Sequence, residues 1–379
     1  MRIILYGPLL LLLACESQHT PWVTTNTKTP YWPLGPFTKA DSLNPILLPN
    51  ATTRFFCPVR KTTLAWEEAN VFNPAAVLRN DTVFLLYRAQ DSLGTSRIGL
   101  AWSTDGLHFT QRAQPVLFPQ NDAYIKWEWP GGCEDPRVVQ DPTGVYYMTY
   151  TAYDGKTARL LVASSPNLVQ WTKHGPAFKT AHGGRYLDFW SKSGAIASDY
   201  SKGTPVAKKL NGKYWMYWGD QNIWNATSTN LIHWTPVVDS TQQLNAEAER
   251  GIAKTVPELQ VALAPRTGKW DSDLVEPGPP AMVTGSGILL LYNSRNIPGI
   301  GDTALTEGTY TAGQALFHIN NPAQLQKRTE NYFMKPEQPY ELSGAVNRVC
   351  FVEGLVRHRN QWLLYYGTAD SKIAVAVAQ

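Results

Sequence analysis

The nine residues Ala101-Trp102-Ser103-Thr104-Asp105-Gly106-Leu107-His108-Phe109 recur twice further along the chain. They return as Ala163-Ser164-Ser165-Pro166-Asn167-Leu168-Val169-Gln170-Trp171 and as Ala226-Thr227-Ser228-Thr229-Asn230-Leu231-Ile232-His233-Trp234, with the alanines 62 and 63 residues apart. The shared pattern is Ala-x-Ser-x-(Asp/Asn)-x-x-x-(Phe/Trp), and weaker echoes occur at Ala315 and Ala376. Each copy is typical of a strand that runs into an Asx or Ser turn, with an aromatic residue that pins the turn.

Two further pieces recur ahead of these copies. Apolar strands that end in an aromatic residue occur at 84–87, 146–150, 214–217, 289–292 and 362–365, and pieces with a polar head occur at 73–77, 134–138, 192–196, 276–280 and 353–356. Short strands repeated at a fixed period are typical of propellers and solenoids. The five units predict an all-β fold, a five-bladed β-propeller that forms one domain over residues 31–379. The alternative, a pair of β-sandwiches, does not explain the period.

The composition suits β-structure and sugar binding. The chain has 379 residues with 14 Trp, 18 Tyr and 12 Phe, and charged residues make up 17%, below the usual ~25%. Aromatic rings stack on the C–H faces of sugars, although we expect most of these rings to pack in the core and the sheets. The net charge is +4, and no basic run is long enough to predict a nucleic-acid partner.

The N-terminus predicts export and a lipid anchor. Met1-Arg2 precedes an apolar run at 3–13, which is typical of a signal peptide and too short for the ~20 residues that span a bilayer. Leu12-Leu13-Ala14-Cys15 resembles a bacterial lipobox, so we expect Cys15 to be lipidated after cleavage of residues 1–15. Residues 16–30 then form a polar tether. The predicted location is the bacterial cell envelope, periplasmic or at the outer surface; an ordinary secretory signal is the alternative.

The remaining cysteines argue against a metal centre. Cys57, Cys133 and Cys350 form no Cys-x-x-Cys pair, so we predict no zinc site, no other metal and no cofactor. An oxidising compartment would allow one disulfide and one buried thiol, and the sequence does not choose the pair. The sequence also leaves the oligomeric state open.

The polar heads of the recurring pieces predict a site on the propeller axis. The first strand of each blade lines the axis, so these five heads should converge: Asn73, Asp135, Lys192, Glu276 and Glu353. The ends of the second strands should add Arg88, Asp91, Asp154, Asp220, Asn293 and Asp370. Carboxylates, bases and amides in a concave site suit a polyhydroxylated ligand and acid–base chemistry. The alternative for any single residue is a structural role, such as bracing an arginine.

Residues Gly131-Gly132-Cys133-Glu134-Asp135-Pro136-Arg137-Val138 resemble the signature of glycoside hydrolase family 130. The resemblance extends over nearly the whole chain after the tether, through 73–75, 87–91, 191–195, 274–279, 352–355 and 364–370. Each motif alone is weak, but six in order at blade intervals are specific. The family contains β-mannoside phosphorylases and β-mannosidases on a five-bladed propeller, so the resemblance implies an oligosaccharide substrate.

The resemblance also implies roles for individual residues. Asp135 would be the general acid, protonating the leaving oxygen in part through a substrate hydroxyl, while Asn73 and Arg88 would hold the sugar at the cleaved bond. Further substrate-binding candidates are Asp91, Arg137, Lys192, Asn293, Glu353 and Asp370. Inversion needs one nucleophile from the opposite face. Hydrolysis uses water activated by a second carboxylate ~6.5–9.5 Å from the acid, for which Asp220 and Glu276 are the candidates.

Phosphorolysis is the alternative reaction, with inorganic phosphate as co-substrate and mannose 1-phosphate as product. Candidate phosphate ligands are Arg137, Arg159, Lys192, His182 and Arg185. We expect hydrolysis of β-mannosides, β-1,2- or β-1,4-linked, because Asp220 would repel a phosphate. Two other classes stay open. Arabinan- and xylan-cleaving propellers carry an aspartate base where this chain has Asn73, and a non-catalytic glycan-binding propeller would not need Asp135.

Overall fold

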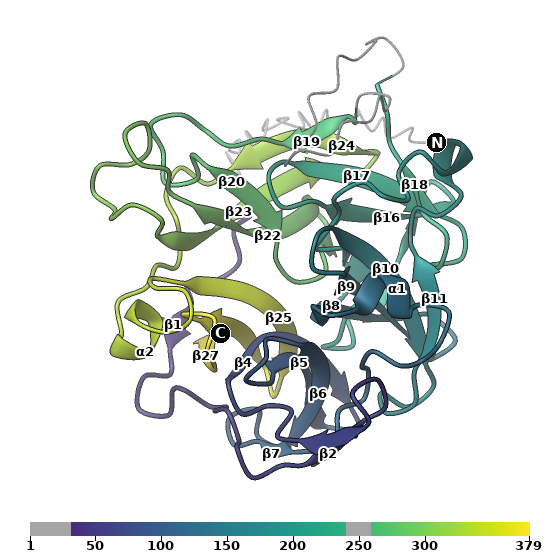
Figure 1. The fold of residues 1–379 in the computed structure, drawn as a ribbon. Coiled ribbons are helices and arrows are strands. Elements are labelled where there is room, and N and C mark those ends of the chain that lie inside the picture. The colour runs from purple at the N-terminus through teal and green to yellow at the C-terminus, as the bar shows by residue number, and fades with distance from the viewer. Residues whose placement is uncertain (1–31, 240–258) are drawn as a thin grey trace, which may run out of the picture. The chain divides into compact units, whose positions relative to one another are not determined.

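The fold is nearly all strands, which confirms the all-β prediction. The computed structural model describes residues 32–239 and 259–379 (Figure 1), and Trp32–Gln379 forms one compact unit. The predicted signal peptide, Cys15 anchor and tether lie outside the described residues. Within the described residues, no helix is long and apolar enough to cross a membrane. The short helices are α1 (Ile125–Glu128), α2 (Pro339–Leu342) and the 3-10 helix η1 (Ala181–Gly184).

Consecutive strands pair antiparallel in meanders that match the sequence repeat. The first comprises β4 (Asn70–Arg79), β5 (Thr82–Gln90), β6 (Ser96–Ser103) and β7 (Thr110–Gln111). The next comprises β8 (Gly132–Gln140), β9 (Tyr146–Tyr153), β10 (Ala158–Ser165) and β11 (Thr172–Pro176). A hairpin precedes them, made of β2 (Phe55–Cys57) and β3 (Thr62–Leu64).

The same arrangement continues to the C-terminus. One meander comprises β12 (Ala195–Ile196), β16 (Lys213–Trp218), β17 (Ile223–Ser228) and β18 (Thr235–Pro236). Another comprises β20 (Leu274–Pro277), β21 (Met282–Thr284), β22 (Gly287–Arg295), β23 (Tyr310–His318) and β24 (Asn321–Arg328). The last comprises β25 (Cys350–His358), β26 (Gln361–Thr368), β27 (Lys372–Ala378) and the early strand β1 (Thr38–Lys39). Short flanking strands are β13 (Ser198–Asp199), β14 (Val206–Ala207), β15 (Lys209–Leu210) and β19 (Val261–Leu263).

The serine of the repeated motif closes the predicted turn. Its hydroxyl oxygen accepts a hydrogen bond from the amide three residues later, at 2.8 Å for Ser103 and Gly106 and at 2.9 Å for Ser165 and Leu168. The third copy, at Ser228, makes the same bond at 3.0 Å. A side chain that satisfies a turn amide explains why the serine recurs.

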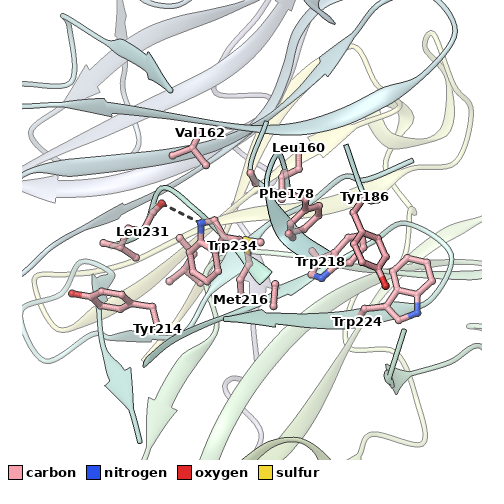
Figure 2. Close-up of a cluster of buried hydrophobic side chains, with 14 of the residues drawn as sticks. Leu160, Val162, Phe178, Tyr186, Tyr214, Met216, Trp218, Trp224, Leu231 and Trp234 are labelled. Carbon is pink, nitrogen blue, oxygen red and sulfur yellow. Dashed lines mark hydrogen bonds between the residues drawn. The ribbon is translucent and has the colours of Figure 1, made fainter. Parts of the chain in front are cut away.

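Aromatic side chains fill the space between neighbouring meanders. Figure 2 shows one such cluster, in which Phe178, Trp218, Trp224 and Trp234 pack with aliphatic side chains from β10 and β16. The Trp234 indole donates a hydrogen bond to the Leu231 carbonyl at 3.1 Å, so its polar atom is satisfied inside the cluster. These tryptophans therefore pack in the core, as expected for most of the aromatic residues.

The first strands bring the predicted polar heads together. β4 lies against both β8 and β25, and Figure 1 shows these three strands close to one another. All three cysteines predicted to lie in the domain are buried free thiols, so the disulfide that the sequence allowed is not formed.

Candidate active site

Six of the predicted residues line one cavity of about 110 Å³. The cavity is bounded by Asn73, Arg88, Asp135, Lys192, Glu276, Tyr310, Val346, Val349, Phe351 and Asp370. The polar residues come from first strands, from the ends of second strands and from the loop before β12. The structure therefore brings together residues that are almost 300 positions apart in the chain.

Irregular backbone aims these side chains. The β4–β5 pairing shifts register at Asn73, and the β8–β9 pairing shifts between Glu134 and Arg137. Such bulges bend a strand and redirect a side chain. Asn73 and Asp135 have φ values of 48° and 46°, and Asp370 has 50°, all in the left-handed region. Non-glycine residues with this conformation cluster at functional sites, where the surrounding structure holds the strain.

Asp135 is the most heavily paired carboxylate of the cavity. The Asn73 amide donates to Asp135 Oδ1 at 2.9 Å, Arg88 Nη1 lies 3.3 Å from the same oxygen, and Lys192 Nζ lies 3.7 Å from Oδ2. Burial raises the pKa of Asp135, but the charges of Arg88 and Lys192 and the Asn73 bond outweigh it and leave the pKa at about 2. Asp135 is therefore ionised at neutral pH, and it must gain a proton after a substrate binds if it is to act as an acid.

Glu276 and Asp370 have the opposite character. Burial raises the pKa of Glu276 to about 7, with the Asp220 charge adding to the rise and Lys192 opposing it. The Ser193 hydroxyl donates to Glu276 Oε1. Burial also raises the pKa of Asp370 to about 6, against the charge of Arg88. A carboxyl whose pKa lies near neutrality is suited to accept or donate a proton in catalysis.

One wall of the cavity was not predicted from the sequence. Tyr310, Val346, Val349 and Phe351 line it, and Tyr310 is joined to Val349 by an isolated parallel bridge. A half-apolar wall facing a polar one matches a sugar ring, which has C–H faces and hydroxyl edges. These four residues follow no repeat in the sequence, because their position results from contact between β23 and the stretch from Val346 to the start of β25.

Two predicted substrate-binding residues do not reach the cavity. Asp91 closes its own turn, since Oδ1 accepts from the amides of Leu93 and Thr95, and Oδ2 pairs with Arg97 at 2.9 Å. Asn293 bonds the backbone of Val352 through both its amide nitrogen and its oxygen, at 3.0 and 2.7 Å. Both side chains are buried and have structural partners, so their role in substrate binding stays a prediction.

Arg137 and Glu353 lie behind the cavity. Arg137 donates to the carbonyls of Gly278 and Pro277, and its Nη1 lies 3.5 Å from Glu353 Oε1. Glu353 is fully buried, and burial raises its pKa well above the usual range. Neither residue lines the cavity, so their predicted contact with a sugar stays a prediction.

Asp220, Asp154 and Arg159 are predicted residues that do not line the cavity. Asp220 lies close enough to Lys192 to raise its pKa, and its Oδ2 accepts a hydrogen bond from the Trp190 indole at 2.9 Å. Asp154 pairs with Arg159, which also lies 3.2 Å from Asp188. The structure therefore places Asp220 beside the cavity, while Asp154 and Arg159 form an ion pair elsewhere. No group of three His, Cys, Asp or Glu residues that could hold a metal occurs within 32–239 and 259–379.

Comparison with known proteins identifies the family. A protein-family model described as β-1,4-mannooligosaccharide phosphorylase matches residues 50–379. The chain belongs to glycoside hydrolase family 130. The resemblance drawn from the motifs is thus confirmed, and the described strands have the β-propeller-like fold of family 130.

Individual relatives differ in their reactions. The chain is 27% identical to a 1,2-β-oligomannan phosphorylase from Thermoanaerobacter, over 88% of this chain and 95% of the relative. It is 45% identical to the structure of a glycosyl hydrolase from Bacteroides ovatus, with a TM-score of 0.86 and coverage of 92% and 95%. It is 42% identical, with the same TM-score and coverage, to a structure described with family 130 hydrolases that target β-1,2-mannosidic linkages in Candida mannan.

Proposed function

We propose that this family 130 enzyme hydrolyses β-mannosides with inversion, acting on manno-oligosaccharides. The observation that carries the proposal is the charge of the cavity. Among its lining residues three are carboxylates, Asp135, Glu276 and Asp370, and two are cations, Arg88 and Lys192. Both cations already lie within 4 Å of Asp135, and Arg88 also pairs with Glu134 at 2.6 Å.

This charge balance disfavours a phosphate ion. A phosphate would have to displace paired carboxylates from Arg88 and Lys192 and then lie beside Glu276 and Asp220, where like charges repel. Two of the other predicted phosphate ligands have partners elsewhere, since Arg137 donates to backbone carbonyls and Arg159 pairs with Asp154. His182 Nε2 lies 3.1 Å from the Pro236 carbonyl oxygen. Water has no charge to be repelled.

The proposed roles follow from position. Asp135, held by Asn73 and Arg88, is the general acid for the leaving oxygen. Glu276 is the general base because it lines the cavity and its pKa of about 7 lets it take a proton from water near neutrality. Asp220 lies beside Glu276 and orients the water or the base. Asn73, Arg88, Lys192 and Asp370 bind sugar hydroxyls.

Phosphorolysis is the second candidate, and the curated relatives favour it over hydrolysis. The curated relatives include β-1,2-mannobiose phosphorylases from Thermoanaerobacter and Listeria innocua. They are 27% identical to this chain, whereas the 42–46% identical structures include proteins described as hydrolases. The carboxylates that line the cavity support hydrolysis, the reaction of the second group.

One assay separates the two reactions. Purified protein is incubated with β-1,2- and β-1,4-mannobiose in buffers with and without inorganic phosphate, and the products are separated. We expect free mannose at the same rate in both buffers. Strict phosphate dependence and release of mannose 1-phosphate would overturn hydrolysis and establish phosphorolysis. Absence of turnover of any mannoside would support a glycan-binding role instead.

We also propose two features of the whole protein. The five meanders are the blades of a five-bladed propeller, supported by the five repeats and by the pairing of β1 with β27. Cys15 carries a lipid that anchors the protein in the bacterial envelope, supported by the lipobox-like residues 12–15. Substitution Cys15→Ala should move the protein from the membrane fraction to the soluble fraction, and unchanged fractionation would contradict the anchor.

A further inference from the structure

The segment Trp190–Ser193 touches all three candidate catalytic carboxylates. The Trp190 indole donates to Asp220 Oδ2 at 2.9 Å, Lys192 Nζ lies 3.7 Å from Asp135 Oδ2, and the Ser193 hydroxyl donates to Glu276. Four consecutive residues thus connect the proposed acid, the proposed base and the carboxylate beside it. The family resemblance covers 191–195 and does not include Trp190.

Backbone contacts fix this segment to the neighbouring meander. The Ser191 amide donates to the Ala158 carbonyl at 3.0 Å, and the Ser191 hydroxyl accepts from the Leu160 amide at 3.0 Å. Gly194 is packed so closely that a Cβ there would lie 2.8 Å from Met216 Sδ. Side chains on so constrained a segment have few alternative positions, so they can set the positions of the groups they contact.

Trp190 and Lys192 hold the turn that carries Asp220 at two points. The Gly219 amide donates to the Lys192 carbonyl at 2.9 Å, next to the indole bond to Asp220. The Trp190 ring packs edge-on against Tyr153, with centroids 6.4 Å apart. The contact with Tyr153 fixes the Trp190 ring, and the Gly219–Lys192 backbone bond fixes the turn. The hydrogen bond from the indole N–H then orients the Asp220 carboxylate.

We propose that Trp190 is a positioning residue that, through its indole N–H, holds the Asp220 carboxylate beside Lys192 and Glu276. The inference rests on the proposed hydrolytic function in one respect, namely that Asp220 assists the base Glu276. Loss of the indole N–H removes one of the contacts that direct the Asp220 carboxylate, so the water that Glu276 must deprotonate is less well oriented. The loss should therefore appear in kcat and leave substrate binding largely intact.

The test uses Trp190→Phe, which keeps an aromatic ring against Tyr153 and removes the N–H. We expect kcat for β-1,2-mannobiose to fall on the order of tenfold or more, the scale of a lost hydrogen bond to a charged group, with KM changed less than about twofold. The matched control is Trp171→Phe, which removes an indole bond of 2.9 Å to the Leu168 carbonyl in a turn of the repeated motif. The control should leave kcat unchanged.

A double-mutant cycle shows whether Trp190 acts through Asp220. If it does, Trp190→Phe combined with Asp220→Asn should lose little more than Asp220→Asn alone. Losses that multiply, or an unchanged kcat in Trp190→Phe, would overturn the proposal. Thermal unfolding of all variants checks that the fold is intact. Phosphate dependence is measured on the wild type alone. That measurement tests the hydrolytic function, whereas the double-mutant cycle tests the role of Trp190, so the two can fail independently.

The pH profile gives a second readout that a purely structural role would not move. The Asp220 charge raises the pKa of Glu276, so displacing Asp220 should lower that pKa and move the rising limb of kcat, which reports the substrate complex, to lower pH. Trp190→Phe and Asp220→Asn should shift the limb in the same direction, while Trp171→Phe should not. An unshifted limb in Trp190→Phe would contradict the proposal. Other charged or titratable groups that act on Glu276 are Lys192, Arg137, Glu353 and Tyr310.

Discussion

At the scale of single residues, the protonation of Asp135 decides the chemistry. Its pKa of about 2 depends on Arg88, Lys192 and Asn73, so the carboxylate is ionised at neutral pH and must gain a proton when a sugar binds. We predict that Asp135→Asn reduces hydrolysis of mannobiose by ~10²–10⁴-fold, because an amide cannot donate this proton. Steady-state kinetics on nitrophenyl β-mannoside provide the control, since a good leaving group needs less protonation. Equal losses on both substrates would indicate that Asp135 only binds the sugar.

The pKa of Glu276 predicts the direction of the pH dependence. A base must be ionised, and Glu276 becomes ionised as the pH rises through about 7. The kcat of the wild type reports the substrate complex, in which Asp135 holds its proton, so kcat should rise with pH as Glu276 ionises. Glu276→Gln should abolish the rise together with most activity. A kcat that falls across this range would instead assign Glu276 as the proton donor and reverse the roles of Glu276 and Asp135.

The residues that the sequence identified and those that it missed differ in one physical respect. Asn73, Arg88 and Asp135 lie at equivalent points of repeated strands, so the repeat predicts where they converge. Asp91 lies equally close to a strand end, but its carboxylate satisfies two turn amides and Arg97, a local preference that the repeat does not reveal. Tyr310 reaches the cavity through a bridge to Val349, a contact between distant segments that no local pattern encodes.

At the scale of elements, a tyrosine–carboxylate pair recurs beneath the second strands. The tyrosine hydroxyl donates to a fully buried carboxylate 20 to 25 residues earlier in the chain, at 2.7 to 2.9 Å. The pairs are Tyr87–Glu67, Tyr150–Glu128, Tyr292–Asp271 and Tyr366–Glu341. Each carboxylate follows an aromatic residue, in Trp66-Glu67, Trp127-Glu128, Trp270-Asp271 and Tyr340-Glu341. The aromatic–carboxylate dipeptide is a repeat that the sequence shows. The hydrogen bond from the tyrosine depends on the fold, so the sequence does not predict it.

The pair beneath β9 offers a test of how much such a carboxylate stabilises its meander. Glu128 Oε2 accepts from Lys173 Nζ at 2.6 Å, and both groups are buried. Glu128→Gln should lower the free energy of unfolding by about 1.5–3 kcal/mol, because it removes the nearer of two carboxylates that pair with Lys173 and leaves Asp122 Oδ2 at 3.2 Å. Tyr217→Phe is the matched control, since the Tyr217 hydroxyl donates to a carbonyl, Pro322, and should cost only about 1 kcal/mol. Denaturant unfolding measures both, and equal losses would show that the carboxylate adds nothing.

At the scale of the whole molecule, an early segment joins the last two meanders. The Gln314 side chain on β23 bonds both backbone groups of Leu34, at 2.8 Å each, and Asn44 does the same for Val375 on β27, at 2.9 Å each. β1 lies between them in the chain and pairs with β27. A sheet that contains strands from both ends of the described chain leaves fewer unpaired edges and resists fraying. The repeat predicted the meanders, but it did not predict that residues 34–47 would complete the last one.

Asn44 tests this closure, because its side chain bonds both the N–H and the C=O of Val375, a carbonyl that also accepts from the Ala40 amide at 3.1 Å. Asn44→Ala removes two hydrogen bonds of about 1 kcal/mol each, and we expect the melting temperature to fall by several degrees. The control Asn121→Ala removes one exposed bond of 3.1 Å to the Pro58 carbonyl and should shift stability by no more than about 0.5 kcal/mol. Differential scanning calorimetry compares the variants, and kcat at 25 °C should be the same in both, because neither side chain lines the cavity. If Asn44→Ala and Asn121→Ala have the same melting temperature, the prediction is wrong, and the bonds from Asn44 to Val375 do not stabilise the last meander.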